Sequence, residues 1–312
     1  MRWELKSNQM NYQSTLDDVH ECVRSYIGKG KVANYIPALA NISPDKFGMA
    51  LRTVDGQGFS IGDAEEKFSI QSISKVFTLT LAMNFLGERL WKRVGKEPSG
   101  DPFNSLVQLE YENGIPRNPL INPGAIVVAD CLLSQYDNPK KEILSFLRKV
   151  TDKKVNFDRG VARSERETGF RNIALANLMK GFGNLDNDVE KVLDVYFHQC
   201  SLSMSCVELA HALGYLANSG VQPESNQRIV SANRARRINA LMLTCGTYDR
   251  AGEFAFSVGL PAKSGVGGGI VAIVPDKLTV CVWSPALGAS GNSVAGMEAL
   301  KRFVKQTALS VF

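Results

Sequence analysis

The sequence has few histidines and no cysteine pair with the spacing of a metal site. It contains only three histidines, His20, His198 and His211, and none has the H-E-x-x-H spacing typical of zinc enzymes. Its six cysteines form no C-x-x-C pair: Cys22, Cys131, Cys200, Cys206, Cys245 and Cys281. In a reducing compartment, unpaired cysteines of this kind are mostly small, buried, apolar residues. We therefore expect no zinc site and no disulfide.

The sequence also lacks a long apolar segment and a strong excess of charge. No run approaches the roughly 20 apolar residues that span a bilayer, and residues 1–6 lack the basic-then-apolar layout of a signal peptide. The net charge is +5, from 36 Lys and Arg against 31 Asp and Glu, and no basic run reaches five residues. We expect a cytoplasmic protein that binds neither membrane nor nucleic acid.

What is present is typical of a globular protein with one large or two small domains. The 312 residues are 44% hydrophobic and 21% charged. Residues 1–14 show no periodicity and are expected to form a flexible tail. Apolar residues three and four apart predict a helix over 16–27. Strands are predicted at 47–54 and 58–62, joined by a hairpin at Asp55-Gly56.

The rest of the chain is first helical and then rich in β-strands. Helices are predicted over 72–86, 124–133, 140–150, 172–179, 188–200, 207–217 and 232–243. Strands follow at 269–274 and 278–283, and then a helix over 293–306 with Asn292 as N-cap. This order predicts a mixed α/β fold of the α+β type. One antiparallel sheet, from 15–62 and 247–312, is flanked by the terminal helices and interrupted by an all-helical domain over 63–246.

The segment Gln71-Ser72-Ile73-Ser74-Lys75 is the first with chemical meaning. Ser72 stands at the start of an apolar helix, and Lys75 lies three residues later on the same face. A serine hydroxyl becomes a nucleophile when a nearby base takes its proton, and a buried lysine has a lowered pKa that suits this role. A simple N-cap serine beside a surface lysine is the alternative interpretation.

A second motif strengthens the catalytic interpretation. Lys263-Ser264-Gly265 precedes a glycine-rich turn and a strand. An S-x-x-K at a helix start together with a later K-[ST]-G resembles the signature of serine enzymes with the β-lactamase fold. Candidates for the middle motif of that fold, at 111–113 and 290–292, are interpreted as turns. The missing middle motif argues against a β-lactamase or a penicillin-binding protein.

Longer segments resemble one family closely. The chain is similar to the bacterial serine-dependent glutaminases, relatives of the catalytic domain of kidney-type glutaminase, from about residue 30 to residue 303. The matching segments include 33–37, 53–56, 71–75, 118–122, 164–169, 171–172, 196–197 and the specific stretch Gly259-Leu-Pro-Ala-Lys-Ser-Gly-Val266. Pro123 departs from the family, which usually has alanine there.

The resemblance implies a role for each matching residue. Ser72 corresponds to the nucleophile and Lys75 to its base, with Tyr248 as a proton shuttle. The substrate pocket corresponds to Tyr35, Gln71, Ser72, Asn122, Glu165, Asn172, Tyr196, Tyr248 and Val266. A carboxylate such as Glu165 suits the α-ammonium group of glutamine, and the backbone N–H groups of Ser72 and Val266 suit an oxyanion.

Each of these residues also has a structural alternative. Tyr35 and Tyr196 could be packing residues, Glu165 could belong to a solvated run of charges, and Asn122 and Asn172 could be helix caps. The resemblance implies a cytoplasmic homodimer or homotetramer that hydrolyses L-glutamine without a metal or cofactor. Another acyl-transfer enzyme of the same fold, or an amino-acid sensor without activity, are the rival interpretations.

Overall fold

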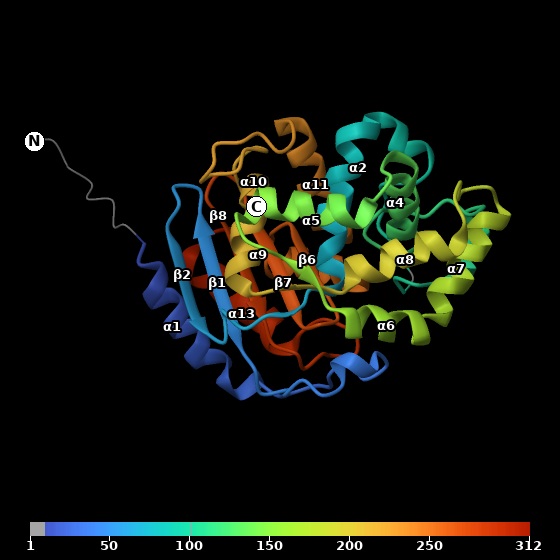
Figure 1. The fold of residues 1–312 in the computed structure, drawn as a ribbon. Coiled ribbons are helices and arrows are strands. Elements are labelled where there is room, and N and C mark those ends of the chain that lie inside the picture. The colour runs from blue at the N-terminus through green and yellow to red at the C-terminus, as the bar shows by residue number, and fades with distance from the viewer. Residues whose placement is uncertain (1–9, 101) are drawn as a thin grey trace, which may run out of the picture.

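Both ends of the chain contribute to one five-stranded antiparallel sheet. The computed structural model describes residues 10–100 and 102–312, and its strands lie in the order β2-β1-β8-β7-β6. Their bounds are Gly58–Gly62, Gly48–Thr53, Leu278–Trp283, Gly269–Val274 and Ala262–Ser264. The hairpin pairs Gly48 with Gly62, and β1 pairs directly with β8. The first and last strands of the chain therefore meet in the middle of the sheet (Figure 1).

The sheet is covered on both faces because alternate residues of its central strands point to opposite sides. Ile270 and Ala272 pack in one apolar cluster with helices α1 (Tyr12–Val23) and α13 (Val294–Thr307). Val271 and Ile273 pack in a second cluster with the helices of the middle of the chain. β7 and β8 are buried along their whole length, which explains why both read as continuous apolar runs.

The middle of the chain is a helical layer built around α2 (Ser74–Leu86). Ten of its residues are buried, and it packs against α4 (Asn122–Gln135), α5 (Pro139–Thr151) and α8 (Val189–Cys200). The other helices are α3 (Leu106–Tyr111), α6 (Arg159–Thr168), α7 (Phe170–Gly181), α9 (Cys206–Ala212), α10 (Gly214–Ala217), α11 (Ala232–Cys245) and α12 (Ala251–Ser257). Figure 1 shows α4, α6, α7 and α8 at the end of the molecule farthest from β2.

The insertion is not wholly helical, which corrects one expectation. It contains a three-stranded sheet in the order β3-β5-β4, with bounds Phe68–Ser69, Leu202–Met204 and Asn156–Phe157. The pattern missed these strands because each has only two or three residues. The predicted helix over 207–217 is also interrupted, at Leu213, between α9 and α10.

The two terminal helices begin at other residues than predicted, and the first also ends earlier, at Val23 and not at residue 27. The first helix begins at Tyr12 because the Asn11 side chain caps it, so residues 12–14 do not belong to a tail. Residues 1–9 of the expected tail lie outside the described residues. The N-cap of α13 is Ser293, whose Oγ accepts from the Gly296 N–H. Asn292 donates instead to the Thr247 carbonyl.

The remaining expectations concern cysteines and membrane spans. Five cysteines are buried as expected, but Cys22 is exposed on α1. Within residues 10–100 and 102–312, no helix has the length and apolar character needed to cross a membrane.

Candidate active site

Ser72 lies where the insertion meets the sheet. It belongs to a 3₁₀ turn, Gln71–Ile73, that leads directly into α2. Gln71 has a φ of 49°, a left-handed conformation that is costly for a residue with a side chain and that clusters at functional sites. Gly265 packs against this turn, and a Cβ there would lie 2.5 Å from the Ile70 carbonyl oxygen. The K-S-G motif and the S-x-x-K motif are thus in contact, and only glycine permits it.

Lys75 is buried behind Ser72, in the first turn of α2. Its Nζ donates to Asn122 Oδ1 at 2.7 Å and to the Leu120 carbonyl at 3.2 Å. Burial lowers the pKa of Lys75 to about 8, although Cys200 and Glu165 oppose this shift. Removing an ammonium group from water favours its neutral form. Lys75 is therefore a buried lysine with a lowered pKa, and it is not a surface lysine.

Asn122 and Asn172 are hydrogen-bonded to each other, and neither residue is a helix N-cap. Asn122 is the first residue of α4, whose N-cap is Ile121, and its Nδ2 donates to Asn172 Oδ1 at 2.9 Å. Asn172 lies in the first turn of α7, after the N-cap Gly169. Pro123 occupies the first turn of α4, where a missing N–H costs nothing. The departure from the family at 123 therefore leaves the Asn122 side chain in place.

Glu165 is a buried carboxylate and not part of a solvated run. Its side chain is 7% exposed, while its neighbours Arg163, Arg166 and Glu167 are exposed. Burial raises the pKa of Glu165 to about 7, and a hydrogen bond with Gln71 and the charge of Lys75 act against that shift. Because burial makes ionisation of a carboxylate unfavourable, a cationic ligand beside it would stabilise the charged form.

Tyr248 completes the site from the sheet side. It has a φ of 60°, and its Oη donates to the Ser264 carbonyl and lies within hydrogen-bonding reach of Ser72. Burial raises the pKa of Tyr248 to about 12, so that it keeps its proton. The Phe103 ring packs against the Tyr248 ring at a tilt of 35°, with centroids 4.6 Å apart.

A second buried lysine, Lys263 of the K-S-G motif, lies behind Tyr248. Its Nζ is 4.4 Å from the centre of the Tyr248 ring and donates to the carbonyls of Gly246 and Ser264. Burial, together with the charge of Lys75, holds the pKa of Lys263 well below its usual range. It therefore supports Tyr248 from beneath and is not in contact with the cavity.

The predicted pocket residues line one cavity of about 470 Å³. They are Tyr35, Gln71, Ser72, Asn122, Glu165, Asn172, Tyr196 and Val266, while Lys75 and Tyr248 lie immediately behind this wall. Tyr196 is buried at 2%, whereas Tyr35 is 58% exposed and stands at the rim. The structure brings all ten predicted residues together.

The cavity also includes residues that the sequence analysis did not assign to it. They are Ile36, Pro102, Phe103, Asn104, Thr168, Gly169, Arg171, Cys200, Asp249, Leu287, Ala289, Ser290 and Gly291. Ser290 and Gly291 belong to a turn, as predicted, but that turn forms part of the wall. Arg171 was inside a recognised segment, and its charge was the available signal for a site role.

Two backbone N–H groups are available beside Ser72. Throughout the described residues, no carbonyl or side chain accepts a hydrogen bond from Ser72 N or Val266 N. Both residues line the cavity, and Gly265 lies between the two segments. Two backbone N–H groups that have no acceptor and lie beside a serine hydroxyl can together stabilise an oxyanion. Within 10–100 and 102–312, no three or more His, Cys, Asp or Glu residues are arranged to hold a metal ion.

Comparisons with known proteins agree on one family. A family model described as glutaminase matches residues 30–312. The glutaminase of Aliarcobacter butzleri is 55% identical over 305 residues, covering 97% of this chain and all of the relative. That of Christiangramia forsetii is 56% identical over 304 residues, with the same coverage.

Solved structures of glutaminases resemble the chain over nearly its whole length. A crystal structure described as a probable glutaminase of Bacillus subtilis has a TM-score of 0.90 at 34% identity and covers 97% of this chain and 98% of its own. Another, described as complexed with 6-diazo-5-oxo-L-norleucine, has a TM-score of 0.89 at 33% identity with the same coverage.

Proposed function

Because this chain belongs to the glutaminase family and is an enzyme that hydrolyses glutamine to glutamate and ammonia, we propose that it works through a glutamyl ester on Ser72. Its fold is the β-lactamase-like fold of the bacterial glutaminases. The observation that carries the proposal is the placement of Ser72 in the cavity wall. Lys75, whose pKa is lowered, follows three residues later in the first turn of α2, and the backbone N–H groups of Ser72 and Val266 have no acceptor in the described structure.

The reaction would begin with Lys75 in its neutral form. Lys75 takes the Ser72 proton while Oγ attacks the side-chain amide carbon of glutamine. The N–H groups of Ser72 and Val266 bind the tetrahedral oxyanion. Tyr248 or Lys75 protonates the leaving nitrogen, and ammonia departs as the C–N bond breaks. If Tyr248 is the donor, Lys75 passes to it the proton taken from Ser72, so that both groups return to their starting states. Water then hydrolyses the ester and returns the proton to Ser72.

Substrate recognition would fall mainly to the insertion. Glu165 is placed to pair with the α-ammonium group, and the amides of Asn122 and Asn172 can hold the carboxylate without a competing charge. The hydroxyls of Tyr35 and Tyr196 offer further donors at the rim and the floor.

Replacing Ser72 tests the nucleophile directly. Ser72→Ala should lower kcat by about four orders of magnitude or more, because the residues of a nucleophile–base pair act as a unit. Ser74→Ala is the matched control two residues away, since Ser74 Oγ is buried without a hydrogen-bond partner in the described structure. Ammonia and glutamate release are measured together. A Ser72→Ala enzyme with a tenth of the normal rate would exclude the ester.

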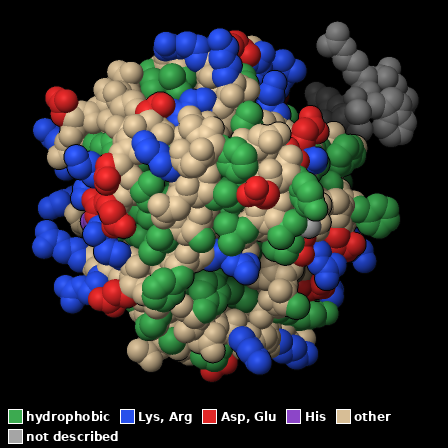
Figure 2. Space-filling view, turned by 90° about the vertical axis from the view of Figure 1, so that its right-hand side faces the viewer, with side chains coloured by type: hydrophobic (Ala, Val, Ile, Leu, Met, Phe, Trp, Pro, Cys, Tyr) green, Lys and Arg blue, Asp and Glu red, His purple; other side chains and the backbone are tan. Residues whose placement is uncertain are grey.

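We also propose that the enzyme is a cytoplasmic homodimer or homotetramer that needs no cofactor. None of its cysteines forms a disulfide, which is typical of proteins in a reducing compartment. Several apolar side chains are exposed near α3 and α7, among them Tyr111 at 83% and Phe170 at 74%. Figure 2, which views that end, shows apolar side chains among charged ones. Light scattering and cell fractionation test these two points.

A further inference from the structure

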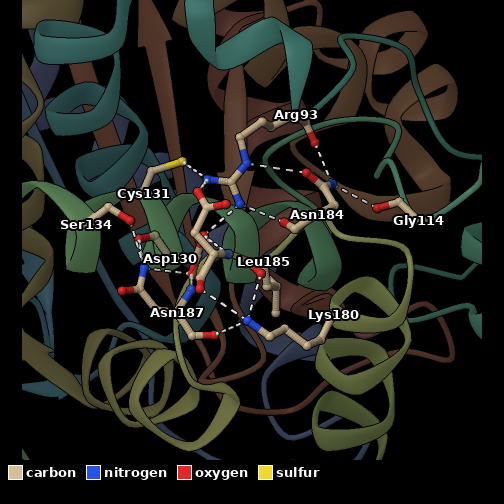
Figure 3. Close-up of polar contacts among 10 residues, drawn as sticks. Arg93, Gly114, Asp130, Cys131, Ser134, Lys180, Asn184, Leu185 and Asn187 are labelled. Carbon is tan, nitrogen blue, oxygen red and sulfur yellow. Dashed lines mark hydrogen bonds and ion pairs between the residues drawn. The ribbon is translucent and has the colours of Figure 1, made fainter.

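A polar network centred on a buried carboxylate lies away from the cavity on the helices that carry the two pocket asparagines (Figure 3). At its centre is Asp130, which is fully buried on α4. Its carboxylate accepts from Arg93 at 2.6 Å, from the backbone N–H groups of Asp186 and Asn187 at 3.0 and 2.9 Å, and from Asn187 Nδ2 at 2.9 Å. Figure 3 shows these groups converging between α4 and the α7–α8 turn.

The side chains of Lys180 and Arg93 donate hydrogen bonds to carbonyl groups of the same turn. Lys180, in the last turn of α7, donates to the carbonyls of Leu185, Asp186 and Asn187 at 3.0–3.1 Å. Arg93 also donates to the Asn184 carbonyl at 2.6 Å. The α7–α8 turn is therefore held by its N–H groups on α4 and by its C=O groups on α7.

The network has a regular relation to the active site. Asp130 follows Asn122 by eight residues on α4, and Lys180 follows Asn172 by eight residues on α7. Eight residues of helix span about 12 Å. α4 and α7 are in contact, and they are bonded at the near end by Asn122 and Asn172 at 2.9 Å. At the far end they are bonded by Asp130, the turn and Lys180.

We infer that Asp130 and Lys180 are positioning residues that fix the separation of α4 and α7, and so hold Asn122 and Asn172 in the geometry that binds glutamine. Burial acts to raise the pKa of the Asp130 carboxyl, but its hydrogen bonds outweigh burial and hold that pKa below its usual value. These four hydrogen bonds also specify one position for the turn. Without the contacts of Asp130 and Lys180 with the turn, α4 and α7 could shift relative to each other. A misplacement of about 1 Å in a site is enough to weaken binding and catalysis strongly.

Lys180 provides the cleaner test because its side chain is exposed and its loss leaves no buried charge. Lys180→Met removes three hydrogen bonds and keeps the aliphatic stem. It should raise KM for glutamine at least about fivefold, with a smaller change in kcat. Lys191→Met on α8 is the control, since the Lys191 side chain has no hydrogen bond or ion pair in the described structure. This control should keep the KM of the unmodified enzyme.

Asp130→Asn should change KM in the same direction and by more, provided that the variant folds. A purely structural role would lower the amount of folded enzyme, and hence the maximal rate, without changing the KM of the molecules that remain folded. Unchanged KM in Lys180→Met, with only a lower midpoint of thermal unfolding, would overturn the inference.

The inference rests on the proposed role of the asparagines, and Asn172→Ala separates the two. If Asn172→Ala leaves KM unchanged, the proposed binding role is wrong. If Asn172→Ala raises KM but Lys180→Met does not, only the positioning role is wrong.

Discussion

The two sides of the cavity are built differently. The insertion contributes side chains, among them Asn122, Glu165 and Asn172, each on a separate helix or helix start. The sheet side contributes the Gly265-Val266 turn with its Val266 N–H group, and the Tyr248 side chain, which donates to the Ser264 carbonyl. In the proposed mechanism, Asn122, Glu165 and Asn172 on the helical side select glutamine, and the sheet side contributes the Val266 N–H as one of the two oxyanion donors. Substitutions on the two sides should therefore have different kinetic signatures.

The largest effect is expected at the junction of the two sides. Lys75→Met removes the proposed base and leaves Asn122 Oδ1 without its 2.7 Å donor. We expect the rate to fall by about four orders of magnitude, because base and nucleophile act together. Steady-state ammonia release measures it, and circular dichroism checks the fold. A loss of less than tenfold would show that another group takes the proton.

Glu165→Gln probes the helical side. An unpaired buried ammonium costs on the order of 2–5 kcal/mol. We expect kcat/KM for glutamine to fall by roughly two to three orders of magnitude at about 1.4 kcal/mol per tenfold. An analogue with the amide but no α-amino group should lose much less. Equal losses for both substrates would mean that Glu165 does not read the ammonium group.

Gly265→Ala probes the sheet side. The added Cβ would lie 2.5 Å from the Ile70 carbonyl and 3.3 Å from Ser72 N, so the two N–H groups must separate. We expect kcat to fall about 10²-fold, the effect of losing an oxyanion donor, with little change in KM. Gly252→Ala, where nothing lies within 4 Å of the added carbon, is the control. A rise in KM without a fall in kcat would reverse the assignment of the two sides.

Glu165→Gln should lower activity but raise the free energy of unfolding at alkaline pH. The folded pKa of Glu165, about 7, lies above its usual value of 4.5. Its contribution to stability is therefore fully present below about pH 4.5 and is lost as the pH rises through about 7. At pH 8, Glu165→Gln should raise the free energy of unfolding by on the order of 3 kcal/mol, and at pH 4.5 by little. Denaturant titrations at the two pH values would contradict this if the difference did not depend on pH.

The smallest effect is expected from chelation. The proposed steps use only Ser72, Lys75, Tyr248 and backbone N–H groups, so prolonged treatment with EDTA should leave the rate unchanged. A loss of activity that zinc or magnesium restores would require a different mechanism on both sides of the cavity.

The sequence predicted the sheet better than the insertion. Strands 269–274, 278–283 and 58–62 have the predicted bounds, because long apolar runs and an Asp-Gly hairpin are strong local signals. The strands β3 to β5 were missed because two or three residues carry no period. The division into units at 62–63 and 246–247 stays a prediction.

The site was predicted in its residues more than in its geometry. Motifs located Ser72, Lys75 and Gly265, and the resemblance supplied Glu165 and Tyr248. The bond between Asn122 and Asn172 joins residues 50 apart and depends on how α4 packs against α7. The contact of Phe103 with Tyr248 and the wall formed by Ser290 and Gly291 also join segments that are far apart in the sequence. No local pattern encodes such contacts.

Covalent labelling would identify the nucleophile most directly. 6-Diazo-5-oxo-L-norleucine is a glutamine analogue with an electrophilic carbon near the place of the amide, and Cys200 offers a competing thiol in the same cavity. Burial holds the pKa of the Cys200 thiol far above its usual range, which leaves it unreactive. We expect peptide mass spectrometry to find the label on Ser72, and no label in Ser72→Ala. A label on Cys200, or undiminished labelling of Ser72→Ala, would contradict the ester mechanism.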